Sequence, residues 1–315
     1  MRILMIGASL GFDSMYLMPA VAKANGVEDF TFGILYHSAA AAYHAGWLER
    51  NAVAYAYYEF CSDKDLVWRR ADKDGNFHPH IPSSANDKYI DDGSITVTPE
   101  FGLKRADWDV VILMASSAEI TGRICEEPRQ NLNMESVDGM MASVKKLLGR
   151  TPKFAWHMIW ALPQDDTLLN DVRRKYLAEY YDGSAMKMYE ANVANTKAVV
   201  IPHLQDKVEY VFPCATAIQN AKSSAFVEDK DIHRDFIHGT DYGRLIATFT
   251  WFCGLTGKDI KTCKFAPIHY GILRNDQGRL AQQVWMPTEL QQKILVESVE
   301  NAYKNPYGLT KSQYQ

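Results

Sequence analysis

The chain has few cysteines and no paired cysteine motif. Its 315 residues include five cysteines, with no C-x-x-C spacing among them. An odd, scattered set fits a reducing compartment and argues against a disulfide framework or a cysteine-rich zinc site. A chain of this length also needs no disulfides, since it can bury about three quarters of its unfolded surface.

Long apolar runs and an excess of positive charge are also lacking. No stretch approaches 18 uninterrupted apolar residues, which predicts no membrane span. The apolar run at residues 3–6 is too short for the core of a signal peptide. The 34 basic and 38 acidic side chains give a net charge of −4, which argues against a nucleic-acid partner. We therefore expect a cytoplasmic protein with no membrane or nucleic-acid partner, unless an exported form was trimmed.

The pattern that is present is that of an α/β protein. Hydrophobic residues make up 47% of the chain, and short β-like runs alternate with longer helix-like ones. The expected strands are residues 2–6, 30–36, 108–114, 154–160 and 208–212. The expected helices are residues 15–25, 43–51, 240–255 and 288–303, with an amphipathic stretch at 167–199 that breaks near Gly183. The pattern predicts one domain over residues 1–315, with an inserted hairpin and loops at about 53–99.

A glycine-serine turn, Ile-Gly-Ala-Ser-Leu-Gly at residues 6–11, follows the first expected strand. It lacks the G-x-G-x-x-G of a dinucleotide site and the Gly-Lys-Ser/Thr of a P-loop. It matches the letters G-x-S-x-G, but the α/β-hydrolase elbow that uses them follows several strands and an upstream oxyanion loop. What remains is Ser9 at the carboxyl end of a strand and the start of a helix. At this position backbone N–H groups and the helix dipole can meet an oxyanion beside Ser9; the alternative is that Ser9 merely caps the helix.

A second polar segment, residues 231–239, precedes the expected helix at 240–255. A serine hydroxyl needs a base to take its proton and a third group to orient that base. Asp235 and His238 stand three residues apart, so one local turn can hold them together. The alternatives are a solvated polar loop, or a metal site made of Asp231, His233, Asp235 and His238. No cluster elsewhere in the sequence completes a metal ligand set.

The order of these segments resembles the SGNH (GDSL-type) serine hydrolases over about residues 1–257. Residues 7–10, Gly-Ala-Ser-Leu, resemble the first block of that superfamily, and Asp235-x-x-His238 resembles the last. The likeness is closest to an uncharacterised, domain-of-unknown-function branch, to which residues 156–161, 215–221, 243–245 and 250–252 are also similar. The resemblance implies a three-layer α/β/α fold with a central parallel five-stranded, flavodoxin-like sheet, followed by an extension at about 258–315. It also implies an esterase with Ser9 as nucleophile, His238 as general base and Asp235 as its orienting carboxylate, requiring neither a metal nor an organic cofactor.

The oxyanion blocks depart from that superfamily. Where the second block has a glycine, residues 37–40 read His-Ser-Ala-Ala, so a backbone N–H of Ser38 or Ala39 is the expected donor. Where the third block has an asparagine, the chain has Ser116, whose hydroxyl is the best remaining donor. Losing one oxyanion donor costs about 100- to 1000-fold in rate. A non-catalytic binding protein that retains the cleft is therefore an alternative.

Substrate-binding residues are expected at the carboxyl ends of the strands, where ligands of such sheets bind. His157 and Trp160 end the fourth expected strand, and Thr216 and Gln219 follow the fifth; core packing or helix capping are the alternatives for these positions. A cleft that is aromatic and polar favours a small-molecule or carbohydrate ester with a short acyl group, such as acetyl, as the substrate.

Overall fold

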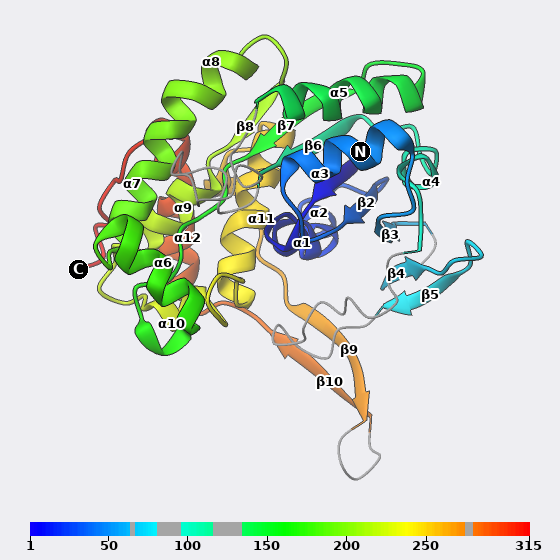
Figure 1. Cartoon of the computed structure of the whole chain (residues 1–315). Coiled ribbons are helices and arrows are strands. Elements are labelled where there is room, and N and C mark those ends of the chain that lie inside the picture. The colour runs from blue at the N-terminus through cyan, green and yellow to red at the C-terminus, as the bar shows by residue number, and fades with distance from the viewer. Residues whose placement is uncertain (64–66, 81–95, 116–133, 275–279) are drawn as a thin grey trace.

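The computed structural model describes residues 1–63, 67–80, 96–115, 134–274 and 280–315, apart from the side chains of 269–274 and 280–283. Its main sheet has eight strands in the order β5-β4-β3-β2-β1-β6-β7-β8 (Figure 1). The strands are β1 (Arg2–Gly7), β2 (Thr31–Tyr36), β3 (Ala56–Cys61), β4 (Trp68–Ala71), β5 (Phe77–His80), β6 (Val110–Met114), β7 (Lys153–His157) and β8 (Tyr210–Phe212).

Five of these strands, β2-β1-β6-β7-β8, run parallel, as the alternating pattern predicts. All residues of β6 are buried, because helices cover both faces of a parallel sheet. The register pairs Gly7 with Tyr36, and Ile6 with Leu113. The carboxyl ends of β1, β2 and β6 therefore lie side by side, which is where a polar site can form.

The expected insertion is part of this sheet rather than a separate feature. Strands β3, β4 and β5 run antiparallel, and β3 pairs with β2 from Thr31–Cys61 to Tyr36–Ala56. The prediction of a five-stranded parallel sheet is therefore wrong in extent: the sheet is mixed and has eight strands. The expected hairpin does form, but its apolar side chains, such as Tyr55 and Tyr57, are buried because they continue the core past β2.

The helices lie in two groups on opposite faces of the parallel strands. Right-handed crossovers require the helices that follow β1 and those that follow β6 to cover opposite faces. The longer helices are α1 (Ser9–Tyr16), α2 (Met18–Ala24), α3 (Ala41–Arg50), α5 (Met134–Leu148), α6 (Asp171–Tyr181), α7 (Ala185–Asn195), α9 (Cys214–Lys222), α11 (Asp241–Thr256) and α12 (Glu289–Lys304). The shorter ones are α4 (Pro99–Leu103), α8 (Ile201–Leu204) and α10 (Asp229–Ile232), with single turns at Asp166–Leu168, Thr196–Val200 and Ile260–Thr262. Helix α3 packs on α5, whereas α1 packs on α11.

Local signals set several helix ends as predicted. Thr240 caps α11 by accepting a hydrogen bond from the Gly243 N–H, and Gly257 ends that helix with φ +67°. Gly183 separates α6 from α7 with φ +72°. The expected helix at 15–25 is instead two helices, and the first begins at Ser9. The glycine-serine turn is thus shorter than the sequence indicates.

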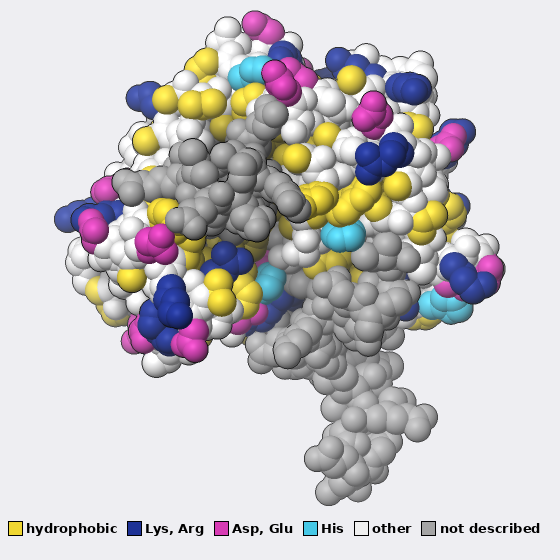
Figure 2. All heavy atoms as spheres, in the orientation of Figure 1, with side chains coloured by type: hydrophobic (Ala, Val, Ile, Leu, Met, Phe, Trp, Pro, Cys, Tyr) yellow, Lys and Arg dark blue, Asp and Glu magenta, His cyan; other side chains and the backbone are white. Residues whose placement is uncertain are grey.

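A second, two-stranded sheet, β9 (Ile268–Arg274) and β10 (Leu280–Trp285), projects from the rest of the chain (Figure 1). On the face in Figure 2, acidic and basic side chains are interspersed. Among the described residues, no helix has the length and apolar character needed to cross a membrane.

Candidate active site

The glycine-serine turn places Ser9 directly over the carboxyl end of β1. A Cβ at Gly7 would lie 2.5 Å from the Met114 side chain, and one at Gly11 would lie 2.8 Å from those of Met5 and Met114. The two glycines therefore let α1 pack closely against the ends of β1 and β6. Their role here is close packing, and the result is that Ser9 begins the helix at the edge of the sheet.

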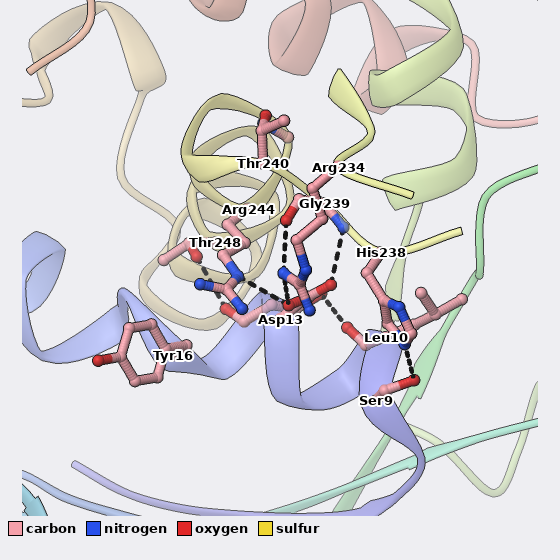
Figure 3. Close-up of polar contacts among 12 residues, drawn as sticks. Ser9, Leu10, Asp13, Tyr16, Arg234, His238, Gly239, Thr240, Arg244 and Thr248 are labelled. Carbon is pink, nitrogen blue, oxygen red and sulfur yellow. Dashed lines mark hydrogen bonds and ion pairs between the residues drawn. The ribbon is translucent and has the colours of Figure 1, made fainter. Parts of the chain in front are cut away.

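Three side chains from two distant segments form a hydrogen-bonded chain at this edge. Ser9 Oγ lies 2.8 Å from His238 Nε2, although 229 positions separate the two residues. On its other side, His238 Nδ1 lies 2.8 Å from Asp235 Oδ2 and 3.0 Å from Oδ1 (Figure 3 shows the Ser9–His238 contact). With Nδ1–H donating to the carboxylate, Nε2 accepts the hydroxyl hydrogen of Ser9. This is the arrangement in which a histidine can take a proton from a serine.

The surroundings of Asp235 keep it ionised. Its Oδ1 accepts backbone hydrogen bonds from the N–H groups of Ile237 and His238, each at 2.9 Å. Burial by itself raises the pKa of Asp235, but the hydrogen bond and charge of His238, together with those backbone donors, hold that pKa below its usual value. The Asp235 side chain is 37% exposed and that of His238 is 19% exposed. The pair is thus anchored, yet open to a ligand.

A buried ionic network ties the His238 loop to α1. Asp13 is fully buried, and its Oδ1 lies 2.7 Å from Arg244 Nε and 3.3 Å from Arg234 Nη1. The other oxygen, Oδ2, accepts the Gly239 N–H at 2.8 Å, next to His238 (Figure 3). Sequence reasoning missed these residues. The sequence does contain a signal for them, since a single carboxylate (Asp13) and a single guanidinium (Arg244) each lie within an otherwise apolar helical segment.

The four predicted substrate-binding residues are buried instead. The indole of Trp160 donates to the Ile237 carbonyl at 2.7 Å, so it supports the loop that carries His238. His157 accepts a hydrogen bond from the Trp251 indole at 3.0 Å, and burial lowers its pKa to about 3. Thr216 donates to the carbonyl of Pro306 at 2.5 Å. With Gln219 only 7% exposed, all four side chains belong to the interior.

The prediction that these four residues line a cleft is not favoured by their burial, which fits core packing instead. It assumed that the carboxyl ends of all five parallel strands are open. At the ends of β7 and β8, the Trp251 side chain of α11 lies against His157, and the Ile237 carbonyl accepts from the Trp160 indole. Among the described residues at this edge, Ser9 after β1 is partly exposed and Ser38 after β2 is exposed.

The predicted oxyanion donors have three different outcomes. Ser38 lies exposed after β2. The Ala39 N–H donates to the His37 carbonyl at 3.0 Å, so in this conformation that group is engaged within its own turn. Ser116 lies outside the described residues. The backbone of the His37 turn is held against the site, since the His37 N–H donates to the Gly7 carbonyl at 3.0 Å.

The four residues of the alternative metal site have separate roles. Asp231 accepts the Glu228 N–H at 2.8 Å and so caps α10, while Asp235 and His238 bond each other. His233 is 1% exposed, and burial lowers its pKa to about 3. Within the part of the chain that the structure describes, no three His, Cys, Asp or Glu side chains gather as a metal site requires.

Comparison with known proteins identifies the family. Residues 2–282 match a family described as "Domain of unknown function (DUF4886)". The chain belongs to the DUF4886 family. The match includes Ser9, Asp235 and His238, and it extends beyond residue 257 into β9 and β10. No curated protein matches the chain.

A solved structure of a DUF4886 family protein from Bacteroides uniformis ATCC 8492 has a similar fold. The two chains are 22% identical, the TM-score is 0.68, and the match covers 99% of this chain and 97% of the other. At this identity the likeness concerns the fold alone. It shows that nearly the whole length of the chain, the segment after residue 257 included, has a counterpart in another DUF4886 protein.

Proposed function

We propose that this DUF4886 protein is a serine hydrolase that cleaves esters through an acyl-enzyme. The observation that carries the proposal is the hydrogen-bonded chain Ser9–His238–Asp235 at the open carboxyl edge of the sheet. The strand order of the parallel strands, β2-β1-β6-β7-β8, is that of flavodoxin-like sheets, and with the first and last sequence blocks it supports an SGNH-type hydrolase.

The geometry supports a two-step reaction. Ser9 Oγ attacks the ester carbonyl carbon while its proton passes to His238 Nε2. His238 then gives this proton to the leaving alcohol as the C–O bond breaks, which leaves an acyl group on Ser9. Water attacks the acyl-enzyme with His238 as base, and release of the acid returns the proton to Ser9. Asp235 holds Nδ1–H throughout and stabilises the imidazolium formed in each step.

The start of α1 offers oxyanion donors in addition to those expected from the altered sequence blocks. The first backbone hydrogen bond of this helix runs from the Phe12 N–H to the Ala8 carbonyl, and the N-cap residue Ala8 offers no capping side chain. The N–H groups of Ser9 and Leu10 thus have no partner within the helix. These groups and the positive end of the helix favour an anion beside Ser9. We assign the oxyanion to them, with Ser38 as a second donor.

Labelling with a fluorophosphonate probe tests the proposal. The probe phosphonylates a serine that a neighbouring base activates, so we expect stoichiometric labelling of wild type at Ser9, located by peptide mass spectrometry. Ser9→Ala should remove the label. Ser14→Ala is the matched control, because Ser14 lies on the same helix but donates to the Leu10 carbonyl at 2.9 Å and should leave labelling unchanged.

The other outcomes separate the alternatives. A protein that binds esters without cleaving them gives no labelling, and a metal-dependent hydrolase gives activity that a chelator removes and Ser9→Ala does not. Either result, or labelling that persists in Ser9→Ala, would overturn the proposal.

We further propose that the substrate carries a short acyl group, on a carbohydrate or similar alcohol. Aromatic rings lie beside the open edge after β2: Tyr43 is 46% exposed and stacks on Trp47, whose ring lies 4.2 Å from that of His37. Exposed aromatic faces of this kind suit a ring-shaped alcohol with both apolar and polar parts. We expect kcat/KM for acetyl esters to exceed that for palmitoyl esters by about tenfold or more. A preference for palmitoyl esters would contradict this assignment.

A further inference from the structure

We propose that Asp13, together with Arg244, is a positioning residue that sets the distance between Ser9 and His238. The proposal rests on the hydrolase function above and concerns the geometry of that same site. Neither Asp13 nor Arg244 belongs to the hydrogen-bonded chain Ser9–His238–Asp235; they act through it.

The first observation is that one helical turn holds both halves of the site. Ser9 and Asp13 are four residues apart on α1, so they lie on the same face of the helix. Asp13 Oδ2 accepts the N–H of Gly239, the residue after His238, at 2.8 Å. The backbone directly after His238 is therefore hydrogen-bonded to the turn of α1 that carries Ser9 (Figure 3).

The second observation is the charge arrangement around Asp13. Its carboxylate faces two guanidiniums, and the side chains of Arg234 and Arg244 are only 6% and 3% exposed. Arg234 Nη1 also donates to the Gly239 carbonyl at 2.8 Å, so both polar groups of the Gly239 backbone are engaged by this network. Moving the loop away would leave buried charges and a buried N–H without these partners, which is strongly unfavourable.

The distance between Ser9 and His238 affects the rate of the proposed reaction. Proton transfer needs Ser9 Oγ and His238 Nε2 at hydrogen-bond distance, and a misplacement of about 1 Å costs about 100-fold in rate. Asp13 touches neither the substrate site nor the reacting atoms. A loss of its charge should therefore lower kcat and leave KM nearly unchanged.

The test compares Asp13→Asn with a matched variant elsewhere in the fold. Glu59 on β3 is likewise buried and paired with two arginines, Arg69 at 3.1 Å and Arg105 at 3.0 Å, two strands away from β1. Glu59→Gln thus removes a comparable buried ionic network and controls for general loss of stability. For wild type and both variants we would measure the fluorophosphonate labelling rate, kcat and KM with an acetyl ester, thermal stability, and amide hydrogen exchange at Gly239.

We expect Asp13→Asn to lower the labelling rate and kcat by about 100-fold with KM unchanged, and to speed exchange of the Gly239 amide. Glu59→Gln should lose thermal stability but keep the wild-type labelling rate and the wild-type exchange at Gly239. The proposal fails if Asp13→Asn lowers labelling no more than Glu59→Gln, or if Gly239 exchanges as in wild type. If wild type is not labelled, the hydrolase function fails; Gly239 exchange then decides by itself whether Asp13 holds the loop.

Discussion

Replacing His238 with alanine should lower ester hydrolysis by about 10⁶-fold, the scale seen when the base of a serine triad is removed. The imidazole lies 2.8 Å from Ser9 Oγ, and its removal takes away the base that accepts the hydroxyl proton in the proposed reaction. Fluorophosphonate labelling of Ser9 should disappear with it. The measurement is kcat/KM for an acetyl ester alongside the rate of probe labelling.

His78→Ala is the matched control for this variant. His78 also contacts an aspartate, with Nε2 2.8 Å from Asp72 Oδ2, but its side chain is 63% exposed on β5 at the far edge of the sheet. We expect this control to keep wild-type activity. Activity that survives in His238→Ala would show that another group deprotonates Ser9 and would remove the basis of the proposed mechanism.

The second large effect is expected from Asp235→Asn, at about 10⁴-fold in kcat. The amide oxygen can still accept the backbone N–H groups of Ile237 and His238, so the loop should keep its shape. What changes is the partner of His238 Nδ1. An amide N–H facing Nδ1 favours the tautomer with hydrogen on Nε2, which cannot accept the proton of Ser9. A crystal structure with an unchanged loop, together with the loss of kcat, would identify this cause.

The same variant makes a prediction about stability and pH. The hydrogen bond and charge of His238, with the backbone donors, hold the pKa of Asp235 below its ordinary value despite burial. A carboxyl group with a lowered pKa stabilises the folded state above its unfolded pKa of about 3.9, and this contribution is lost as pH falls through its folded pKa. Asp235→Asn should therefore be less stable than wild type near neutral pH, and the difference should shrink in strong acid.

Asp72→Asn serves as the control for the kcat measurement. Asp72 is another aspartate with a histidine partner, yet it lies on the distant edge of the sheet with β4 and β5. We expect its kcat to match wild type. If Asp72→Asn and Asp235→Asn lower kcat equally, the effect is not a property of the site around Ser9.

Part of this architecture follows from the sequence because its causes are local. Apolar runs predict the five parallel strands, and Thr240 and Gly257 predict the two ends of α11. The turn at Gly7 and the Asp235-x-x-His238 spacing identify the segments that the structure brings together. Each of these patterns can be recognised from residues that are close together in the sequence.

The extent of the sheet and the surroundings of the site needed the tertiary structure. Nothing in residues 53–63 says that β3 pairs with β2, because pairing depends on a partner strand elsewhere. His157 and Trp160 look like cleft residues from their place at a strand end, but Trp251 of α11 and the Ile237 carbonyl contact them and both are buried. Burial is a property of everything packed on a residue, and no local pattern records it.

The sequence by itself predicted the five parallel strands and the ends of α11, and it identified Ser9, Asp235 and His238 as candidate site residues. Only the tertiary structure decided that Ser9 and His238 lie 2.8 Å apart, and that Asp13 ties the loop of one to the helix of the other. The physical reason is the separation along the sequence between the residues that make each contact. Helix caps and strand patterns depend on bonds between residues a few positions apart, whereas this site depends on contacts across more than 220 positions, which exist only once the core has packed.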